Sequence, residues 1–290
     1  MSLSIIIISF KSNIFLEKCL KSISNQSYAP DEIILYDNNS PISPRNIFSK
    51  ESIKLRKVKR KYIQGSENIG FANAVNIAIK QATSELIILI NPDTVLDRNF
   101  IKNIYSFYFD HMEEEKIILG GRSLSWRNKD ILKTVVNAPD FKTLAFEFTS
   151  LKKIFPKNKF SNNFWNERLL RTKKNINVFG VSCNLMMFSK KDFLKIGKFD
   201  ENYFLYLEDY DFCIRANNLN YKIYYVANAK AKHFHGGSNR NKKGKINQKA
   251  WDNSKKHFIK KWFGARGEGL SLLFAIDNML LRIYKFLFKK

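Results

Sequence analysis

Three carboxylates stand within four consecutive residues of an apolar segment, FLYLEDYDFCIRA (residues 204–216). They are Glu208, Asp209 and Asp211, and their neighbours are mostly aromatic or aliphatic. Burying a carboxylate costs free energy unless the group is paired, hydrogen-bonded or bound to a cation. A charge cluster is most often a solvated face, but the aromatic setting here favours a site.

The spacing within this segment indicates different roles for two of the carboxylates. The pattern predicts a helix that begins at EDYD and runs to about Asn218. Asp211 and Arg215 are four residues apart and would form an ion pair on that helix, so a structural role for Asp211 stands beside a catalytic one. Asp209 in the first turn would be favoured as an anion by the helix dipole. A positioned, ionised carboxylate in an apolar pocket is what a general base requires.

A further acidic group, Asp93, lies in the tetrad NPDT (residues 91–94) directly after an apolar run. Mg²⁺ typically takes one or two protein carboxylates together with substrate phosphates, which suits this tetrad. A helix cap or Asx turn explains the tetrad alone equally well. The segment KHFHGGS (residues 232–238) offers His233 and His235, and a neutral imidazole there could complete a metal site with Asp93.

Alternating strands and helices would have to position these groups. Apolar runs predict buried strands, and apolar residues at helical spacing predict the helices between them. The predicted strands are Ser4–Phe10, Glu32–Tyr36, Leu55–Ile63 and Glu85–Ile90, and the predicted helices are Asn13–Asn25, Ala72–Gln81 and Asp97–Asp110. This alternation indicates an α/β fold with a doubly wound, mostly parallel sheet flanked by helices. In such sheets ligands bind beyond the carboxyl ends of the strands, where the tetrads DNNS (residues 37–40) and NPDT stand.

The pattern weakens after residue 120. Residues 127–174 lack clear periodicity and are expected to form a mobile, substrate-facing insertion. A strand or strand pair is expected at Val178–Ser189, a short helix at Lys190–Ile196 and a strand at Tyr221–Val226. The last forty residues are basic and aromatic and are expected to be helical.

Charge is the outlying property of the composition, with 50 Lys and Arg against 26 Asp and Glu and a net charge of +24. Such an excess favours nucleic acid, anionic lipid or phosphate-bearing substrates as partners. The apolar fraction of 44% supports a sizeable core. Three widely spaced cysteines give no disulfide framework and no zinc spacing, which indicates a reducing, cytoplasmic compartment. The apolar run of MSLSIIIISF is too short for a membrane span and is expected to be a buried strand rather than a signal.

In this order, the motifs resemble glycosyltransferase family 2, the inverting enzymes of the GT-A fold, and within it the rhamnosyltransferase-like branch. The resemblance is carried by SIIIISF, DNNS, NIGFANAVNIAI, NPDT, FGVSCNLMMFSKKDFLKIGKFDENYFLYLEDYDFCIRA and HFHGGS. It implies a glycosyltransferase domain at residues 1–240, with a nucleotide-sugar half at about 1–120 and an acceptor half at about 175–240. Residues 241–290 would form a basic, amphipathic helical extension.

The resemblance also implies roles for single residues. Those matched to nucleotide-sugar binding are Ser9, Asp37, Asn39, Asn68, Gly70, Asn73, Asn91 and Asp93. Asp93 would bridge Mg²⁺ or Mn²⁺ to the diphosphate, with His233 as the second protein ligand. Asp209 matches the catalytic base, with Glu208 beside it as an acceptor contact.

The acceptor side is matched by Phe204, Tyr206 and Asp211. The family reaction implied is a single displacement in which a deprotonated acceptor hydroxyl attacks the anomeric carbon opposite the diphosphate. The branch implies dTDP-L-rhamnose as donor, with UDP-hexoses as the alternative. The acceptor would be a saccharide or a polyprenyl-diphosphate-linked sugar of bacterial cell-surface polysaccharide synthesis.

Three features depart from the family pattern or leave a choice. Lys11 follows Phe10 where the family often has Asn, which affects contact with the base. Asn91 replaces the first Asp of the family's D-x-D motif and leaves one carboxylate fewer. His235 competes with His233 for the metal, although the H-x-x-G-x-S spacing favours His233.

The C-terminal segment concentrates the positive charge, with 16 Lys and Arg against 3 acids in residues 230–290. In residues 270–290 the polar side chains fall within about 140° of a helical wheel, and Asp277, Asn278 and Arg282 argue against a transmembrane span. An interfacial helix on an anionic membrane is expected, which would place the protein peripherally at the inner face of the cytoplasmic membrane. Docking of this helix on the catalytic domain or on the second copy in a homodimer is the alternative.

Two other classes of protein were weighed against this interpretation. A nucleic-acid-binding protein would need a helix-turn-helix, zinc or sheet-aromatic motif, and the sequence contains none, so no specific nucleic-acid partner is expected. A sugar nucleotidyltransferase would need a Gly-rich phosphate loop near the N-terminus, which the sequence also lacks.

Overall fold

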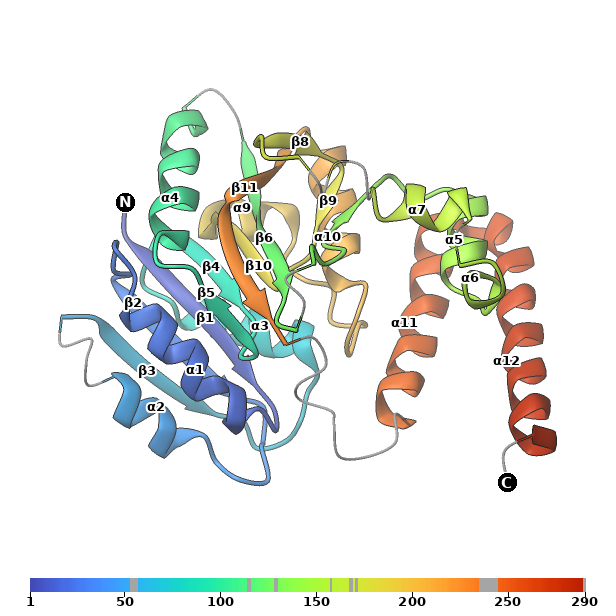
Figure 1. The fold of residues 1–290 in the computed structure, drawn as a ribbon, viewed down its shortest axis with the longest axis horizontal. Coiled ribbons are helices and arrows are strands. Elements are labelled where there is room, and N and C mark those ends of the chain that lie inside the picture. Colours follow the sequence, from blue (N-terminus) through green and yellow to red (C-terminus); the bar gives the residue numbers. More distant parts are fainter. Residues whose placement is uncertain are drawn as a thin grey trace.

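The computed structural model describes residues 1–52, 57–113, 116–127, 130–156, 158–166, 169, 172–234 and 245–288. Across these residues, the main sheet has nine strands in the order β3-β2-β1-β4-β10-β6-β11-β5, with β8 beside β11. Helices cover both faces of this sheet, and a separate group of helices stands at one end of it (Figure 1). The mixed α/β architecture predicted from the sequence is confirmed.

The first four predicted strands form the parallel part of the sheet. They are β1 (Leu3–Ser9), β2 (Glu32–Asp37), β3 (Lys59–Gln64) and β4 (Leu86–Ile90). β1 is buried at every position and pairs in parallel with β2 and β4, while β3 pairs with β2. Leu55 and Arg56, which were predicted to open the third strand, lie outside the described residues. The carboxyl ends of β1, β2 and β4 therefore meet at one edge.

The helices between these strands bury one face each. They are α1 (Asn13–Ser24), α2 (Arg45–Ser52), α3 (Phe71–Gln81) and α4 (Phe100–His111). α1 and α4 contribute to the apolar core on one face of the sheet, and α3 contributes to the core on the other. The helix predicted at Asp97–Asp110 is α4, and it begins three residues later than predicted. Asp97 follows the short strand β5 (Thr94–Leu96), and its backbone N–H donates to the carbonyl of Lys230 instead of opening the helix.

The second half of the sheet mixes directions. β10 (Leu185–Ser189) is antiparallel to β4 and to β6 (Ile117–Ser125), and β11 (Lys222–His233) runs parallel to β6. β11 extends well past the predicted end at Val226, because a bulge before Lys230 restores its pairing with β6 and lets it pair with β5. The predicted short helix is α9 (Lys190–Ile196), and the helix predicted from EDYD is α10 (Glu208–Asn218).

The weak periodicity of residues 127–174 conceals regular structure, while a mobile, substrate-facing role for this insertion stays a prediction. The described part of this region forms a short strand and three helices, and it is followed by two further strands. These elements are β7 (Val135–Val136), α5 (Phe141–Glu147), α6 (Leu151–Ile154), α7 (Lys159–Phe164), β8 (Ile176–Val178) and β9 (Gly180–Val181). β7 pairs with β9, and α5 packs against the C-terminal helices, so partners distant in sequence stabilise this region.

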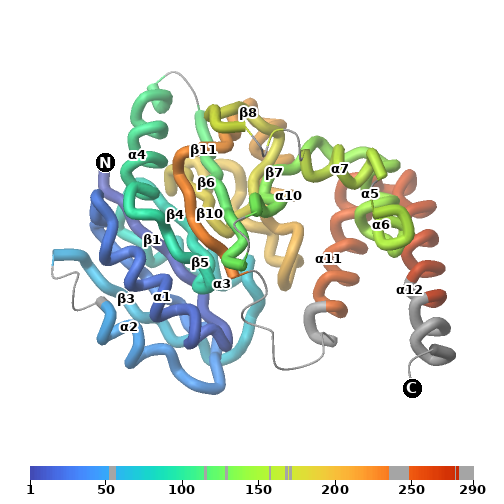
Figure 2. Tube along the Cα trace, in the orientation of Figure 1, coloured from blue at the N-terminus to red at the C-terminus, as the bar shows by residue number. Residues whose placement is uncertain are grey.

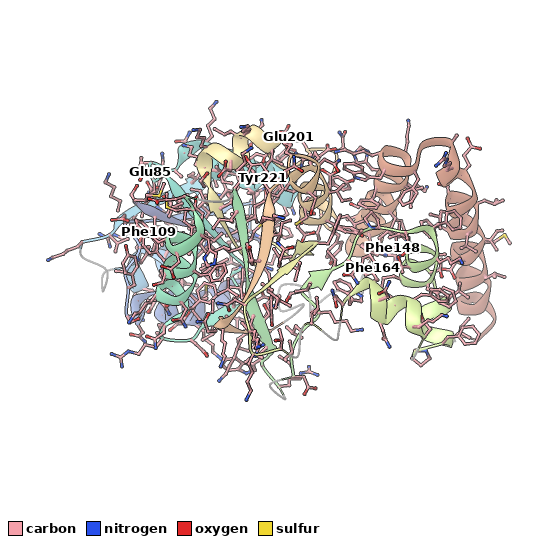
Figure 3. The ribbon with its side chains drawn as sticks, turned by 90° about the horizontal axis from the view of Figure 1, so that it is seen from above. Glu85, Phe109, Phe148, Phe164, Glu201 and Tyr221 are labelled. Carbon is pink, nitrogen blue, oxygen red and sulfur yellow. The ribbon has the colours of Figure 1, made fainter. Side chains whose placement is uncertain are left out.

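The C-terminal residues form α11 (Lys245–Phe263), a 3₁₀ turn η2 (Gly264–Gly267) and α12 (Glu268–Phe288), as the prediction of helical structure required. Together with α5, α6 and α7 they make up what is called here the helical appendage, at the right of Figures 1 and 2. Phe148, labelled in Figure 3, lies at its centre. Its ring lies 5.2–6.3 Å from the rings of Phe164, Trp251, Phe258 and Phe274.

Among the described residues, no helix combines the length and apolar character needed to cross a bilayer. α12 packs on the rest of the protein through the buried residues Leu270 and Phe274, and the Asp277 carboxylate accepts a hydrogen bond of 3.0 Å from the backbone N–H of Ser150. The opposite side of α12 is exposed and carries Leu272, Ile276, Met279 and Leu280.

Candidate active site

The first predicted residues, Ser9 and Asp37, are the last residues of β1 and β2 and lie at the common edge of the parallel strands. Ser9 is fully buried, and its hydroxyl lies 2.8 Å from that of Ser12. Asp37 is also fully buried, and its carboxylate accepts hydrogen bonds from the backbone N–H of Ser40 at 2.9 Å and from the Tyr62 hydroxyl at 3.0 Å. These bonds compensate for burial of the charge and fix the direction of the side chain.

Asn38 organises the neighbouring loop, and sequence reasoning missed it. Its amide nitrogen donates to Asn68 Oδ1 at 2.9 Å and to the carbonyl of Gly70 at 3.0 Å, while its oxygen accepts from the backbone N–H of Ile69. Asn39, which was predicted instead, is exposed and has a left-handed backbone with φ of 60°. The only signal in the sequence was the position of Asn38 inside DNNS.

Gly70 brings its own loop against the loop that precedes α10. Its φ is 84°, and a Cβ atom there would stand 2.5 Å from the carbonyl oxygen of Phe204. The same carbonyl accepts a hydrogen bond of 2.7 Å from the backbone N–H of Phe71. Only glycine combines this backbone conformation with so close an approach. The glycine of the N-x-G motif is therefore required for contact between the two loops.

The predicted metal residues form a direct pair. Oδ1 of Asp93 lies 2.9 Å from Nε2 of His233, although the two residues are 140 positions apart. Pairing of β5 with β11 places Thr94 opposite His233, and the Phe234 backbone N–H donates to the Asp93 carbonyl. His235, the competing ligand, lies outside the described residues.

Asp209 lies in the first turn of α10 and is held from the loop before β10. Its carboxylate accepts hydrogen bonds from the backbone N–H of Cys183 at 3.1 Å and of Tyr210 at 2.8 Å. Burial raises the pKa of Asp209, whereas these hydrogen bonds lower it. Burial is the larger effect, so the pKa lies above its ordinary value. A raised pKa makes the carboxylate a stronger base.

Glu208 is buried beside Asp209. Burial, with the neighbouring Asp209 charge as a smaller cause, raises the pKa of Glu208 to about 8. Oε1 of Glu208 accepts from the thiol of Cys183 at 3.8 Å, and Oε2 is buried without a hydrogen-bond partner. Near neutral pH this carboxyl is largely protonated and can donate a hydrogen bond.

The chain bends sharply just before α10. Tyr206 and Leu207 both have left-handed backbones, with φ of 74° and 69°. Such conformations are uncommon for bulky residues and persist where the surrounding structure imposes them. The bend leaves Phe204 and Tyr206 partly exposed, at 38% and 37%, next to the buried carboxylates.

A comparison with family models decides the class of the protein. Residues 4–197 match the Glycosyl transferase family 2 model. The chain belongs to glycosyltransferase family 2. The family predicted from the motifs is thereby confirmed, and with it the enzyme class of a glycosyltransferase.

Curated relatives of this family 2 chain are named as sugar transferases, one of them for glycan biosynthesis. It is 26% identical over 225 residues to a low-salt glycan biosynthesis hexosyltransferase of Haloferax volcanii, covering 76% of this chain and 63% of that protein. It is 22% identical over 253 residues to an N-acetylglucosaminyl-diphospho-decaprenol L-rhamnosyltransferase of Mycobacterium tuberculosis, covering 80% of this chain and 75% of that one. The chain thus spans less than two thirds of the first relative.

Solved structures of glycosyltransferases share the fold. TarS of S. aureus, residues 1–349 in complex with UDP-GlcNAc, has a TM-score of 0.57 at 17% identity and covers all of this chain and 76% of that one. GalNAc-T7 with UDP, GalNAc and Mn²⁺ has a TM-score of 0.59 at 13% identity, covering 80% and 44% of the two chains. The GT-A fold predicted for the family 2 chain is confirmed.

The remaining predicted residues of the family 2 chain differ in their surroundings. The Asn91 backbone N–H donates to the carbonyl of Asn184, and the side chain of Asn73 donates to the carbonyl of Glu201 in the loop before α10. Asp211 is fully buried, and the predicted ion pair with Arg215 is present at 2.9 Å.

α11 supplies further partners for Asp211. Oδ1 of Asp211 accepts hydrogen bonds from Lys261 Nζ at 2.7 Å and from Trp262 Nε1 at 2.9 Å. With all of these bonds the Asp211 carboxylate ties α11 to α10. This geometry supports the structural role for Asp211 that the sequence left open beside a catalytic one.

Proposed function

We propose that the protein is a metal-dependent, inverting glycosyltransferase that moves a sugar from a nucleotide-sugar to an acceptor hydroxyl. The observation that carries the proposal is the loop before β10. There Cys183 binds Asp209 through its backbone N–H, and the next residue, Asn184, lies against His233 of the Asp93–His233 pair. One short loop thus lies between a candidate base and a candidate metal site.

The Asp93–His233 pair fits a divalent cation. Two adjacent ligands at about 2.1 Å from an octahedral ion stand about 3.0 Å apart, close to the 2.9 Å between Oδ1 and Nε2. Among the described side chains, no group of three or more His, Cys, Asp or Glu could hold an ion. Two protein ligands leave room for diphosphate oxygens and water, which is the usual arrangement for Mg²⁺. A bound Mg²⁺ or Mn²⁺ would stabilise negative charge on the departing diphosphate.

The chain's own residues account for the other steps. Asp209, held by two backbone N–H groups, takes the proton from the acceptor hydroxyl as that oxygen bonds to the anomeric carbon. The bond from this carbon to the diphosphate oxygen breaks on the opposite face, and the electron pair leaves with the diphosphate. Glu208, buried and largely protonated, donates a hydrogen bond to the acceptor. Ser9, Asp37 and the Asn68–Gly70 loop hold the nucleotide.

The names of the relatives support a role in glycan synthesis, but they do not identify the donor and acceptor of this protein. We take L-rhamnose from dTDP-rhamnose as the donor group, with hexoses from UDP-sugars as the alternative. A polyprenyl-diphosphate-linked saccharide is the proposed acceptor, since one relative is named for a decaprenol-linked one. Such an acceptor requires that the protein reach a membrane surface.

The exposed side of α12 supports attachment to an anionic membrane. Leu272, Ile276, Met279 and Leu280 are 43–63% exposed and fall within about 100° of the helical wheel. An outward-facing apolar stripe on a helix is unusual in a soluble protein unless something covers it. The surplus of 24 positive charges favours an anionic lipid surface as that cover.

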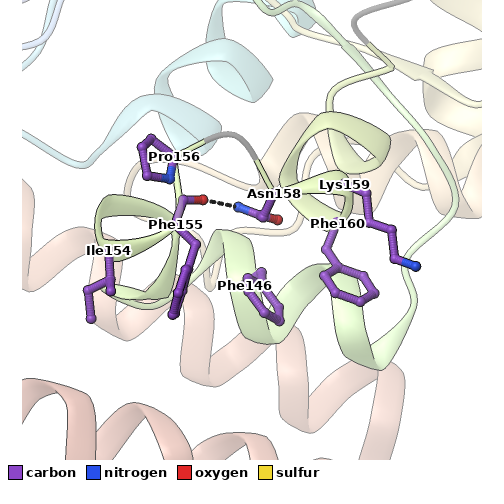
Figure 4. A pocket seen from close by; sticks show the side chains of 7 residues that line it. All are labelled: Phe146, Ile154, Phe155, Pro156, Asn158, Lys159 and Phe160. Carbon is purple, nitrogen blue, oxygen red and sulfur yellow. Dashed lines mark hydrogen bonds between the residues drawn. The ribbon is translucent and has the colours of Figure 1, made fainter.

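A groove in the helical appendage is a second apolar surface. It has a volume of about 600 Å³ and opens between α6 and α7, where Ile154 and Phe155 are 63% and 55% exposed (Figure 4). The lining residues are Phe146, Ile154, Phe155, Pro156, Asn158, Lys159 and Phe160. Lys159 lies at this groove as a cationic partner for lipid phosphate. We propose that this face of the appendage rests on the bilayer.

Substitution of Asp209 by Asn tests the catalytic assignment. Asn keeps the shape of the side chain but cannot accept the proton, so we expect sugar transfer to fall by about 10²–10⁴-fold. Donor binding, measured by calorimetry, should stay within about threefold of the wild type. Asp211→Asn serves as the comparison, because its loss should lower the melting temperature rather than selectively abolish turnover. A variant Asp209→Asn that retains wild-type turnover would remove Asp209 as the base.

A further inference from the structure

A buried asparagine that no motif singled out lies behind the metal pair. Asn184 is 4% exposed and sits directly before β10. Its Nδ2 is 2.7 Å from Ser123 Oγ and 3.4 Å from Nδ1 of His233, while its Oδ1 is buried without a hydrogen-bond partner. A buried amide with one side satisfied and one side unpaired is costly and calls for an explanation.

With the amide of Asn184 oriented as in the structure, the contacts favour one tautomer of the imidazole ring. An amide NH₂ group only donates, so Nδ1 of His233 accepts from Asn184 and the ring proton is on Nε2. Nε2–H then donates to Oδ1 of Asp93 at 2.9 Å. In this tautomer Nε2 carries the proton and has no lone pair available for coordination. The histidine therefore cannot bind a cation through that nitrogen.

A turn of the amide about its Cβ–Cγ bond reverses the arrangement. The unpaired oxygen would then accept from Nδ1–H of His233 and from the Ser123 hydroxyl. Nε2 would present a lone pair toward Asp93, where a cation binds. Histidine ligands of metals usually donate their other ring N–H to such an acceptor, which fixes the tautomer.

We infer that Asn184 is the positioning residue that sets the tautomer of His233, and that its amide reverses when a divalent cation binds at Asp93 and His233. The inference rests on the proposed metal site. It assigns a specific use to an amide rather than a carboxylate at this position. An amide can serve both tautomers, whereas an aspartate could only accept from a protonated Nδ1.

Nitrogen NMR of histidine-labelled protein tests the metal-free half of the inference. The chain has 4 His, so the His233 signals can be assigned with a His233→Gln variant. Wild-type protein without metal should show His233 with its proton on Nε2. In Asn184→Asp the proton should move to Nδ1, because the carboxylate accepts. A proton on Nδ1 in the metal-free wild type, or no change in Asn184→Asp, would overturn the assignment.

Titration of Mn²⁺ in the presence of saturating UDP, and separately dTDP, tests the metal-bound half. Asn184→Leu lacks any acceptor and should bind Mn²⁺ about 10–100-fold more weakly than the wild type, while Asn184→Asp should stay within about threefold or bind more tightly. Asn217→Leu, which removes an amide bonded to the Phe179 carbonyl on the far end of α10, controls for loss of stability.

The outcomes separate the two proposals. If the wild type binds Mn²⁺ and Asn184→Leu binds it equally well, the role of Asn184 is refuted and the metal site stands. A parallel loss in Asn184→Leu and Asn184→Asp, with both folded by circular dichroism, also refutes it. If the wild type binds no Mn²⁺ with either nucleotide, the metal site fails and the metal-driven reversal fails with it.

Discussion

The two sides of the candidate site, one predicted to bind the donor and the other the acceptor, are stabilised in different ways. The donor side stands on the parallel strands β1, β2 and β4, whose aliphatic side chains are buried throughout and whose carboxyl ends share one edge. The acceptor side stands on α10, which the helical appendage holds through aromatic rings and charged groups. Tyr210 stacks on Phe258 at 5.1 Å, and Lys261 binds Asp211.

Because of this difference, the two substrates would meet parts of the protein that differ in rigidity. The carboxyl ends of these inner strands are rigid, because each strand forms backbone hydrogen bonds with a neighbouring strand on both sides. The acceptor side depends on a few side chains of α11, and the exposed apolar face of α12 follows directly in sequence. The surface that we propose to contact a membrane is thus linked through α11 to the helix that carries Asp209.

The largest expected effect concerns membrane attachment by the appendage. Ile276→Asp together with Leu280→Asp places charge on the exposed stripe, and we expect flotation with anionic liposomes to fall to background. Leu219→Asp, at a comparably exposed leucine outside the appendage, should float like the wild type. Equal flotation of the double variant and the wild type would contradict a role of α12 in lipid binding.

A smaller effect is expected from the charged link between α11 and α10. Lys261 binds Asp211 at 2.7 Å and Asp200 at 2.7 Å. Burial alone would raise the pKa of Asp200, but hydrogen bonds from Lys261 and His257 hold it below its ordinary value. Lys261→Met should therefore lower stability by about 1–3 kcal/mol, since Asp211 loses a partner while still buried.

Thermal unfolding measures this difference, and Lys260→Met at the exposed neighbour is the matched control. The acceptor side should lose order first, so binding of a nucleotide-sugar should change less than turnover. A Lys261→Met protein as stable as Lys260→Met would show that the appendage does not support α10.

A further expected effect is a pH dependence of stability at Glu208. Because the folded pKa of Glu208 is about 8 and its ordinary value is 4.5, the folded protein binds more protons than the unfolded chain between these values. Stability should therefore decline as pH rises through this window. Glu208→Gln removes the contribution, so its melting temperature relative to the wild type should increase from pH 5 to pH 8. A constant difference across that range would contradict a protonated Glu208.

Local sequence patterns were sufficient for the donor side. The bounds of β1, β2, α3 and β4 agree with the prediction to within one residue. Each of these elements has a continuous apolar run or a helical stripe that dictates its own conformation. The same holds for α10, where EDYD opens the helix and Arg215 pairs with Asp211.

Patterns failed where partners are distant in the sequence. Phe148 looks unremarkable in its own segment, and its burial arises from Trp251, Phe258 and Phe274 about a hundred residues later. Asn38 and Asn184 were missed for the same reason, because an asparagine has no periodicity and its partners are set by the folded loops. A metal site of Asp93 with a histidine of KHFHGGS was suggested by the residue types, and the family resemblance favoured His233 over His235.

The most direct test of the central claim is a thermal-stabilisation screen of nucleotide-sugars with and without Mg²⁺ or Mn²⁺. The account predicts that dTDP-rhamnose or a UDP-hexose raises the melting temperature only when the metal is present, and that Asp93→Ala abolishes the metal-dependent part of the shift. Asp97→Ala, at a nearby acid beyond β5, should respond like the wild type. No shift by any nucleotide-sugar, or an undiminished metal-dependent shift in Asp93→Ala, would contradict the account.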